Sequence, residues 1–272
     1  MPMNALSSLP AAGFRGSRPL LVALLGVVTY LIVRLIPLGP PWGTVIRFGL
    51  VVLVALVIIR ALVAEWTWDF LPARAPVGWL LAFGLGFLGV LVATGLPLLL
   101  SGGSFDPETS HRLAEGIGLG ADPAVNQAIV IGWVIAAPIA GELVFRGMVF
   151  AGLRNGLDQW LETTPAVVTA AVVSAIAFTL VTRPGPALLM LGFGLAALVW
   201  AFGYHLTGSL LVGVGSLGAA IAWLLWTLLH GSNAVAAGDG STMAMIVVGP
   251  LAAIGVARLL GRMIAVGTAT SG

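Results

Sequence analysis

Residues 124–150 have the sequence AVNQAIVIGWVIAAPIAGELVFRGMVF, an apolar run that is long enough to cross a lipid bilayer. A helix needs about 20 residues to span a hydrocarbon core of roughly 30 Å. The run contains one acid and one base, Glu142 and Arg146, spaced four residues apart. This spacing places both side chains on one face of a helix, where they can form an ion pair. The stretch therefore predicts a membrane-spanning helix that carries a charge pair.

Similar apolar runs occur on both sides of this stretch, and together they predict about eight membrane-spanning helices. The spans are expected at 19–38, 43–64, 77–100, 124–150, 165–182, 186–204, 209–230 and 242–264. The 272-residue chain is 59% hydrophobic and 8% charged. A water-soluble domain of this length could not bury so many apolar side chains and would expose large hydrophobic patches. We therefore expect an all-α polytopic membrane protein that forms a single transmembrane domain over residues 1–272.

The arginines between the spans predict how the chain is oriented. Arg15 and Arg18 precede the first span, Arg74 precedes the third, Arg154 follows the fourth and Arg262 ends the eighth. Basic residues gather on the cytoplasmic side of a membrane, so both termini are expected in the cytoplasm. No lysine occurs, and Ala, Gly and Val are abundant, which is typical of a GC-rich genome. We expect the protein to lie in the inner membrane of a bacterium such as an actinomycete.

Composition also limits the chemistry. The chain has no cysteine, so disulfides, thiolate metal sites and cysteine nucleophiles are excluded. The net charge is +2 and the arginines are scattered, so no nucleic acid is expected as a partner. The longest connection, about 101–123, contains several acids and His111, but their spacing matches no metal-ligand motif. We expect it to be a solvated loop on the outer side, without a metal.

Small residues recur every four positions in the fourth span, at Gly132, Ala136 and Ala140, and Gly147 is a further small residue along the same span. Small residues at this spacing let two membrane helices approach closely. We expect this face to pack against neighbouring helices. An ionised residue in hydrocarbon costs roughly 2.5–3.5 kcal/mol on insertion scales, so Glu142 and Arg146 are either a structural ion pair or part of a functional site.

The segment Gly141-Glu142-Leu143-Val144-Phe145-Arg146-Gly147 resembles the first motif of the CAAX-protease and bacteriocin-processing (CPBP, or ABI) family of intramembrane proteases. In that family two adjacent glutamates are followed, four residues after the second, by an arginine. A Phe-xxx-His motif comes next, and a His-xxx-Asn/Asp motif follows a Thr-Gly-Ser-Leu type turn. Here Phe178 begins the second motif, and Thr207-Gly208-Ser209-Leu210 opens the third. The resemblance covers 124–225.

The resemblance implies a metalloprotease in which the first glutamate activates water, while the histidines and the Asn/Asp bind metal or stabilise the oxyanion. This chain departs from that set. Gly141 stands in the place of the first glutamate, and Thr182 in the place of the Phe-xxx-His histidine. For the third motif, the family spacing points to Leu217 and Ile221, or to Ser216 and Ala220 if it shifts by one residue. None of these residues is a usual metal ligand.

Other residues do not replace the missing groups. His205 and His230 are expected near opposite faces of the membrane, away from the charge pair. A serine-based site built on Ser174, Ser209 or Ser216 would need a histidine at a suitable spacing, and the sequence offers none. We therefore expect a degenerate, non-catalytic member of the family, with no catalytic residues and no cofactor.

A fold that keeps its shape without its chemistry retains its surface and its cavity. We expect an accessory or scaffolding subunit of a larger membrane assembly, with membrane lipids and other integral membrane subunits as partners. An envelope lipid transporter of the Mce type is one host that an actinobacterial source would provide. Two alternatives remain: an active intramembrane protease that uses Glu142, and a small transporter. The single charge pair, with no chain of acids along a pathway, disfavours transport.

Overall fold

The computed structural model describes residues 14–15, 18–39, 42–63, 65–66, 76–102, 107–120, 122–231 and 240–269. Helices account for nearly all of these residues, as the hydropathy predicts. The first half contains α1 (Pro19–Leu35), α2 (Gly43–Leu62), α3 (Pro76–Val90), the π-helical turn η2 (Leu91–Gly95), α4 (Leu96–Leu100) and α5 (Pro107–Gly116). A two-residue antiparallel pair joins β1 (Phe14–Arg15) to β2 (Glu65–Trp66), which the sequence did not predict.

The central element is one continuous composite helix over 123–157. It consists of α6 (Pro123–Val130), η3 (Ile131–Ala136), α7 (Ala137–Glu142), η4 (Leu143–Phe150) and α8 (Ala151–Leu157). Asp122 caps its start by accepting a hydrogen bond from the Ala124 amide at 2.9 Å, and Pro123 occupies the first helical position. Among the membrane-length helices, this one is the most deeply buried. The predicted span 124–150 is thus extended by two turns.

Four further helices complete the bundle: α9 (Thr163–Thr182), α10 (Ala187–Thr207), α11 (Leu210–Gly231) and α12 (Gly240–Ala269). Gly208 ends α10 in the left-handed conformation with φ 68°, which glycine adopts without strain. The turn Thr207-Gly208-Ser209-Leu210 therefore reverses the chain between α10 and α11. Because this turn is short, the two helices run antiparallel.

The described residues include seven helices that are long and apolar enough to cross a membrane, and the 17-residue α1 is an eighth, shorter apolar helix. The chain is an all-α multi-pass membrane protein, as the composition predicts. The first predicted span, 19–38, ends early because Pro37 disfavours a helical conformation at Ile36, which is extended with φ −68° and ψ 122°. At 1.5 Å per residue α1 is about 26 Å long, close to the thickness of the hydrocarbon core.

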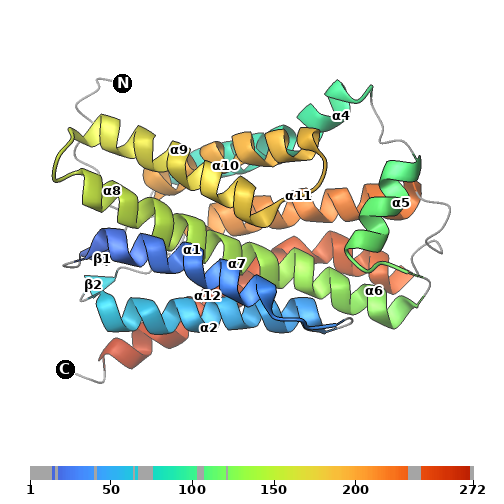
Figure 1. Cartoon of the computed structure of the whole chain (residues 1–272), viewed down its shortest axis with the longest axis horizontal. Helices are drawn as coiled ribbons and strands as arrows, with labels where there is room; N and C mark the ends of the chain where they lie inside the picture. The colour runs from blue at the N-terminus through green and yellow to red at the C-terminus, as the bar shows by residue number, and fades with distance from the viewer. Residues whose placement is uncertain are drawn as a thin grey trace.

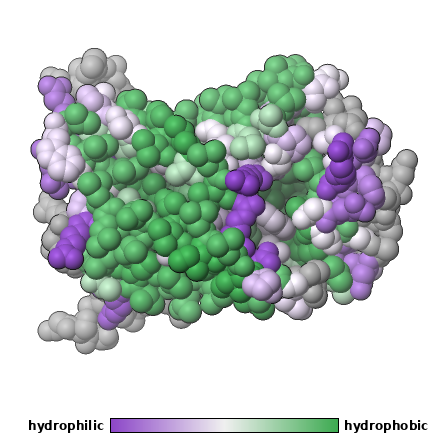
Figure 2. Space-filling model, in the orientation of Figure 1, coloured by the Kyte–Doolittle hydropathy of each residue, from purple (hydrophilic) through white to green (hydrophobic). Residues whose placement is uncertain are grey.

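The long helices run along a common direction, and the two ends of the bundle differ (Figure 1). The start of α1, the end of α8 and the end of α12 lie at one end, and α5 lies at the other. Hydrophobic residues cover much of the face shown in Figure 2, as a surface in contact with lipid requires. Hydrophilic residues interrupt this face between its two apolar halves (Figure 2).

The connection 101–123 differs from the expected solvated loop, because α5 forms within it. One face of α5 is buried at Ser110 and Ala114, and the other carries exposed charges. Two pairs with i,i+4 spacing line that outer face: His111 with Glu115 at 3.2 Å, and Arg112 with Glu108 at 3.4 Å. The segment is amphipathic, and its apolar face packs against the bundle. Its overall composition is polar, so composition alone does not reveal the apolar face.

Candidate functional site

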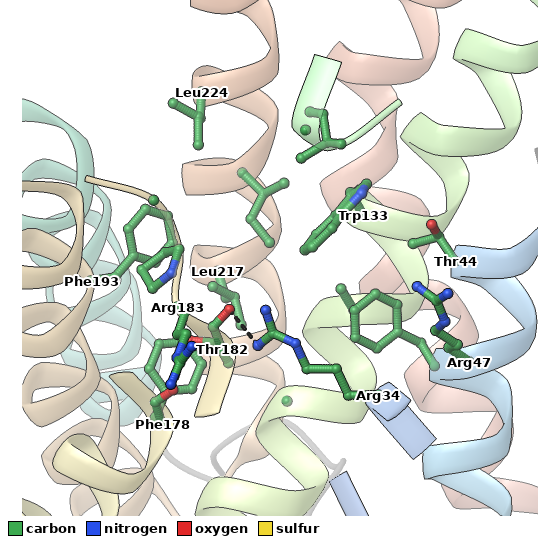
Figure 3. Close-up of a pocket in the computed structure, with 18 of the residues that line it drawn as sticks. Arg34, Thr44, Arg47, Trp133, Phe178, Thr182, Arg183, Phe193, Leu217 and Leu224 are labelled. Atoms are coloured by element: carbon green, nitrogen blue, oxygen red, sulfur yellow. Dashed lines mark hydrogen bonds between the residues drawn. The ribbon is translucent and has the colours of Figure 1, made fainter. Parts of the chain in front are cut away.

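A cavity of about 420 Å³ lies inside the bundle, where α1, α2, α5, α7, α9, α10 and α11 meet. Its wall is largely apolar and includes Phe48, Trp133, Phe193 and Leu224. Figure 3 shows aromatic and aliphatic side chains converging on this space from several helices. The volume falls in the range of about 300–1,000 Å³ that is usual for small-molecule sites.

The positions inferred from motif spacing come together at this cavity. Gly141 on α7, Phe178 and Thr182 on α9, and Leu217 and Ile221 on α11 all line it. A Cβ built on Gly141 would lie 3.4 Å from Leu217 Cδ2, so these two motif positions face each other across a narrow gap. Three segments that are distant in sequence therefore meet where the resemblance places a hydrolytic site.

The alternative register of the third motif points elsewhere. Ser216 donates a hydrogen bond to the Gly86 carbonyl at 2.7 Å and accepts one from Trp200 Nε1 at 2.7 Å. Ala220 is fully buried and does not line the cavity. Leu217 and Ile221, which do line it, are the better structural counterparts of the third motif.

The side chains at these positions offer little chemistry. Gly141 has no functional group, and Leu217 and Ile221 are aliphatic. The Thr182 hydroxyl donates to the Phe178 carbonyl one turn earlier in its own helix, at 2.7 Å. The wall at the motif positions thus provides no carboxylate to take a proton from water and no imidazole to hold a metal.

Glu142 and Arg146 form a buried ion pair that does not line the cavity. Arg146 Nη1 lies 3.2 Å from Glu142 Oε1, and each side chain is 1% exposed. Arg146 Nη2 donates to the Ala197 carbonyl on α10 at 3.3 Å. The guanidinium also lies 4.9 Å from the ring centre of Phe178 and 5.2 Å from that of Trp200. The pair therefore joins the composite helix to α9 and α10.

The Glu142 carboxylate is directed at α11 rather than at the cavity. A Cβ added to Gly213 would overlap this carboxylate, so only glycine leaves room for it. Gly132, one of the small residues along the same composite helix, has a comparable role, because a built Cβ there would lie 2.8 Å from Thr44 Cγ2 of α2. Ala140 and Gly147 are buried, and Ala136 is partly buried.

The serines considered as nucleophiles hold structural hydrogen bonds. Ser174 donates to the Phe145 carbonyl at 2.7 Å, which ties α9 to the composite helix. Ser209 accepts from the Leu211 amide at 3.3 Å at the start of α11. Together with the bonds of Ser216, these contacts match the usual use of small hydroxyls in membrane helices.

Histidines do not approach the site in the described part of the chain. His205 lies in the last turn of α10, with its ring 6.5 Å from that of Phe150. His111 belongs to the outer face of α5, and the side chain of His230 lies outside the described residues. No group of three or more His, Asp or Glu side chains that could hold a metal ion occurs within the described ranges.

The sequence did not identify three further residues of the cavity. Arg34, Arg47 and Arg183 line its mouth, and Figure 3 shows Arg34 reaching toward Thr182. In the sequence, Arg34 and Arg47 fall near the outer ends of the first two spans, a position from which a long basic side chain is expected to reach the membrane interface. The sequence indicates that Arg34 and Arg47 lie near the same side of the membrane. Sequence spacing alone could not show that both side chains point to one cavity.

Fold and site together define a class: an all-α multi-pass membrane protein with an apolar cavity among its helices. Residues 124–216 match the family model of the type II CAAX prenyl endopeptidase Rce1-like domain. This segment is thus similar to an Rce1-like domain, in agreement with the CPBP resemblance. The match covers about a third of the chain and ends just before Leu217. Comparisons with curated proteins and with solved structures gave no match.

The family is one of proteases, and the resemblance implies a metal-dependent site. The described residues do not fit a bound metal ion. At the cavity they place a glycine, a threonine and two aliphatic side chains, while the one nearby carboxylate, that of Glu142, is paired with Arg146 and turned toward Gly213. No hydrolytic step can be derived from these groups.

Proposed function

We propose that this chain is a non-catalytic Rce1-like membrane protein that acts as an accessory or scaffolding subunit of a larger membrane assembly. The observation that carries the proposal is the cavity itself. None of the motif positions that line it, which are Gly141, Phe178, Thr182, Leu217 and Ile221, carries a group suited to activating water. Without a group to activate water, the domain still offers its surface and its cavity to partners and ligands.

The ion pair supports a structural use of the remaining motif residues. Glu142 and Arg146 are buried between helices and reach neither the cavity nor the surface. Buried pairs of this kind contribute to the choice of helix register in some proteins. We infer that the pair fixes the composite helix against α10 and α11.

The proposed setting is the inner membrane of a bacterium, with both termini in the cytoplasm. Support comes from the arginines at 15, 18, 74 and 262 in the sequence, and from the start of α1 and the end of α12 lying at one end of the bundle. An envelope lipid transporter of the Mce type is the concrete host we propose, on the ground of the composition typical of a GC-rich actinobacterial genome.

The test is purification of the tagged protein from its native membrane in mild detergent, with stoichiometry by mass spectrometry. Glu142→Gln, which keeps the shape of the side chain, is purified alongside. We expect other integral membrane subunits at fixed ratios with both forms. Recovery of an isolated protein, together with a membrane-protein fragment that is lost in Glu142→Gln, would instead establish the protease.

A further inference from the structure

Three arginines at the mouth of the cavity have no acidic partner among the described residues. Arg34 comes from the end of α1, Arg47 from the first turns of α2, and Arg183 follows α9. The ion pairs of the described chain involve other basic residues, and no aspartate or glutamate lines the cavity. Arg112, a fourth arginine of the lining, is 67% exposed and pairs with Glu108. The mouth therefore carries an uncompensated positive charge.

Two of these guanidinium groups are held in place by helix ends. Arg34 Nη1 donates to the carbonyls of Val181 and Thr182, the latter at 2.8 Å, as the dashed line in Figure 3 shows. Arg47 donates through Nε to the Ile36 carbonyl at 3.1 Å and through Nη2 to the Leu38 carbonyl at 2.7 Å. Neutral carbonyls orient these groups without cancelling their charge, and each guanidinium keeps further N–H donors.

Arg183 occupies an unusual backbone position. Its φ is 43° and its ψ is 67°, and it is the one described non-glycine residue with positive φ. This left-handed conformation at a helix end is usually taken by glycine, which has no Cβ to clash. Here it is taken by an arginine whose side chain borders the cavity. Strained positions of this kind often mark a binding site.

The mouth lies where lipid headgroups are expected. The composite helix 123–157 has 35 residues and is about 52 Å long, so it extends past the hydrocarbon core. By contrast α1 and α9 end beside the cavity, and α2 begins there. Trp42 immediately precedes α2 and is 53% exposed, as is typical of aromatic residues at the membrane interface.

Below this charged rim the cavity is apolar. Phe48, Phe178, Leu217 and Ile221 form part of its wall, and the Thr182 hydroxyl beside them donates to the Phe178 carbonyl. A ligand that satisfies both regions has a negatively charged head and a hydrocarbon chain. Arginine suits such a head, since its planar group donates two parallel hydrogen bonds to a phosphate.

We propose that the cavity is a binding site for an anionic phospholipid, whose phosphate lies between Arg34, Arg47 and Arg183 and whose acyl chain enters the space lined by Leu217 and Ile221. Basic pockets between membrane helices bind anionic headgroups through the same chemistry at the cytoplasmic side of other membrane proteins. The inference goes beyond the accessory role, and it holds for the isolated protein whether or not partner subunits are present.

The test is native mass spectrometry of the purified full-length protein, given equal amounts of phosphatidylglycerol and phosphatidylcholine with identical acyl chains. We expect the wild type to retain one phosphatidylglycerol in preference to phosphatidylcholine. Arg183→Gly removes one charge and suits the left-handed backbone, so it should fold well while retaining about fivefold less phosphatidylglycerol. Arg183→Lys keeps the charge and should retain most of the preference. The control Arg60→Gln changes an exposed arginine at the opposite end of α2 and should behave as wild type.

Binding of the acyl chain is tested with Ile221→Trp, and with Leu224→Trp as a second variant. Both residues line the cavity, so a tryptophan at either position should occupy part of its volume. We expect either one, when monodisperse, to retain less of both lipids. Equal retention of the two lipids by the wild type, or unchanged retention in Arg183→Gly, would overturn the proposal. A third result would also overturn it. If inorganic phosphate raised the melting temperature as much as phosphatidylglycerol does, and still did so in Ile221→Trp, the arginines would bind a soluble anion.

Discussion

At the scale of single residues, the Glu142–Arg146 pair is the feature whose removal should matter most. Both groups are 1% exposed, so a variant that removes one leaves the other charge buried without its partner. Removing one member of a buried pair costs about 3–5 kcal/mol, whereas replacing both with apolar residues is often nearly neutral. We expect Glu142→Leu and Arg146→Met each to lower the melting temperature in detergent, and the double variant to recover most of the loss.

The wild type, the two single variants and the double variant form a double-mutant cycle, which distinguishes a structural ion pair from a functional one. Thermal unfolding of the four proteins gives the interaction free energy directly. Losses that simply add in the double variant would contradict a structural pairing.

Gly213 provides a second test at this scale. Because a Cβ at this position would overlap the Glu142 carboxylate, Gly213→Ala should displace the acid and destabilise the protein by about 1–3 kcal/mol. Gly255→Ala on α12, where nothing lies within 4 Å of a built Cβ, is the matched control. Thermal unfolding in detergent measures both, and equal melting temperatures would show that the carboxylate can move freely.

Gly141, Phe178, Thr182, Leu217 and Ile221, the positions counted from the motifs, line one cavity, and motif spacing can be counted because it is a property of the sequence. The same reasoning could not orient Arg34. Its side chain is long enough to reach either the interface or the cavity, and the choice depends on the carbonyls that end α9, which are distant in sequence.

At the scale of helices, the approach of α2 to the composite helix depends on Gly132. A Cβ there would lie 2.8 Å from Thr44 Cγ2, so Gly132→Val should force the helices apart and cost about 1–3 kcal/mol. Gly49→Ala changes an open position of α2 and should leave stability nearly unchanged. The melting temperatures of the two variants in detergent check this expectation. An unaltered Gly132→Val protein would show that this contact does not determine the packing.

Hydropathy predicted the long helices well, because a run of about 20 apolar residues has few alternatives to a membrane helix. Shorter elements escaped it. The helix α5 was expected as a loop, since its charged face dominates the composition of 101–123, and the early end of α1 depends on one proline. The pairing of β1 with β2 joins segments about 50 residues apart, which local patterns do not report.

At the scale of the whole molecule, the two ends of the bundle should face opposite compartments. The chain lacks cysteine, so a single introduced cysteine reports its own location. We expect Glu115→Cys, on α5, to react with a membrane-impermeant maleimide in intact cells. Gln159→Cys, after α8, should react only once the membrane is permeabilised, because the positive-inside rule places that end in the cytoplasm. The opposite labelling pattern would reverse the proposed orientation.

The cavity is expected not to hydrolyse peptide bonds. The N-termini of all membrane proteins should be compared in a strain that lacks this chain, complemented with the wild type or with Glu142→Gln. We predict the same set of N-termini in both complemented strains, because Glu142 is paired with Arg146 and turned away from the cavity. A cleaved N-terminus that appears with the wild type and disappears with Glu142→Gln, at equal amounts of the two proteins, would contradict the account.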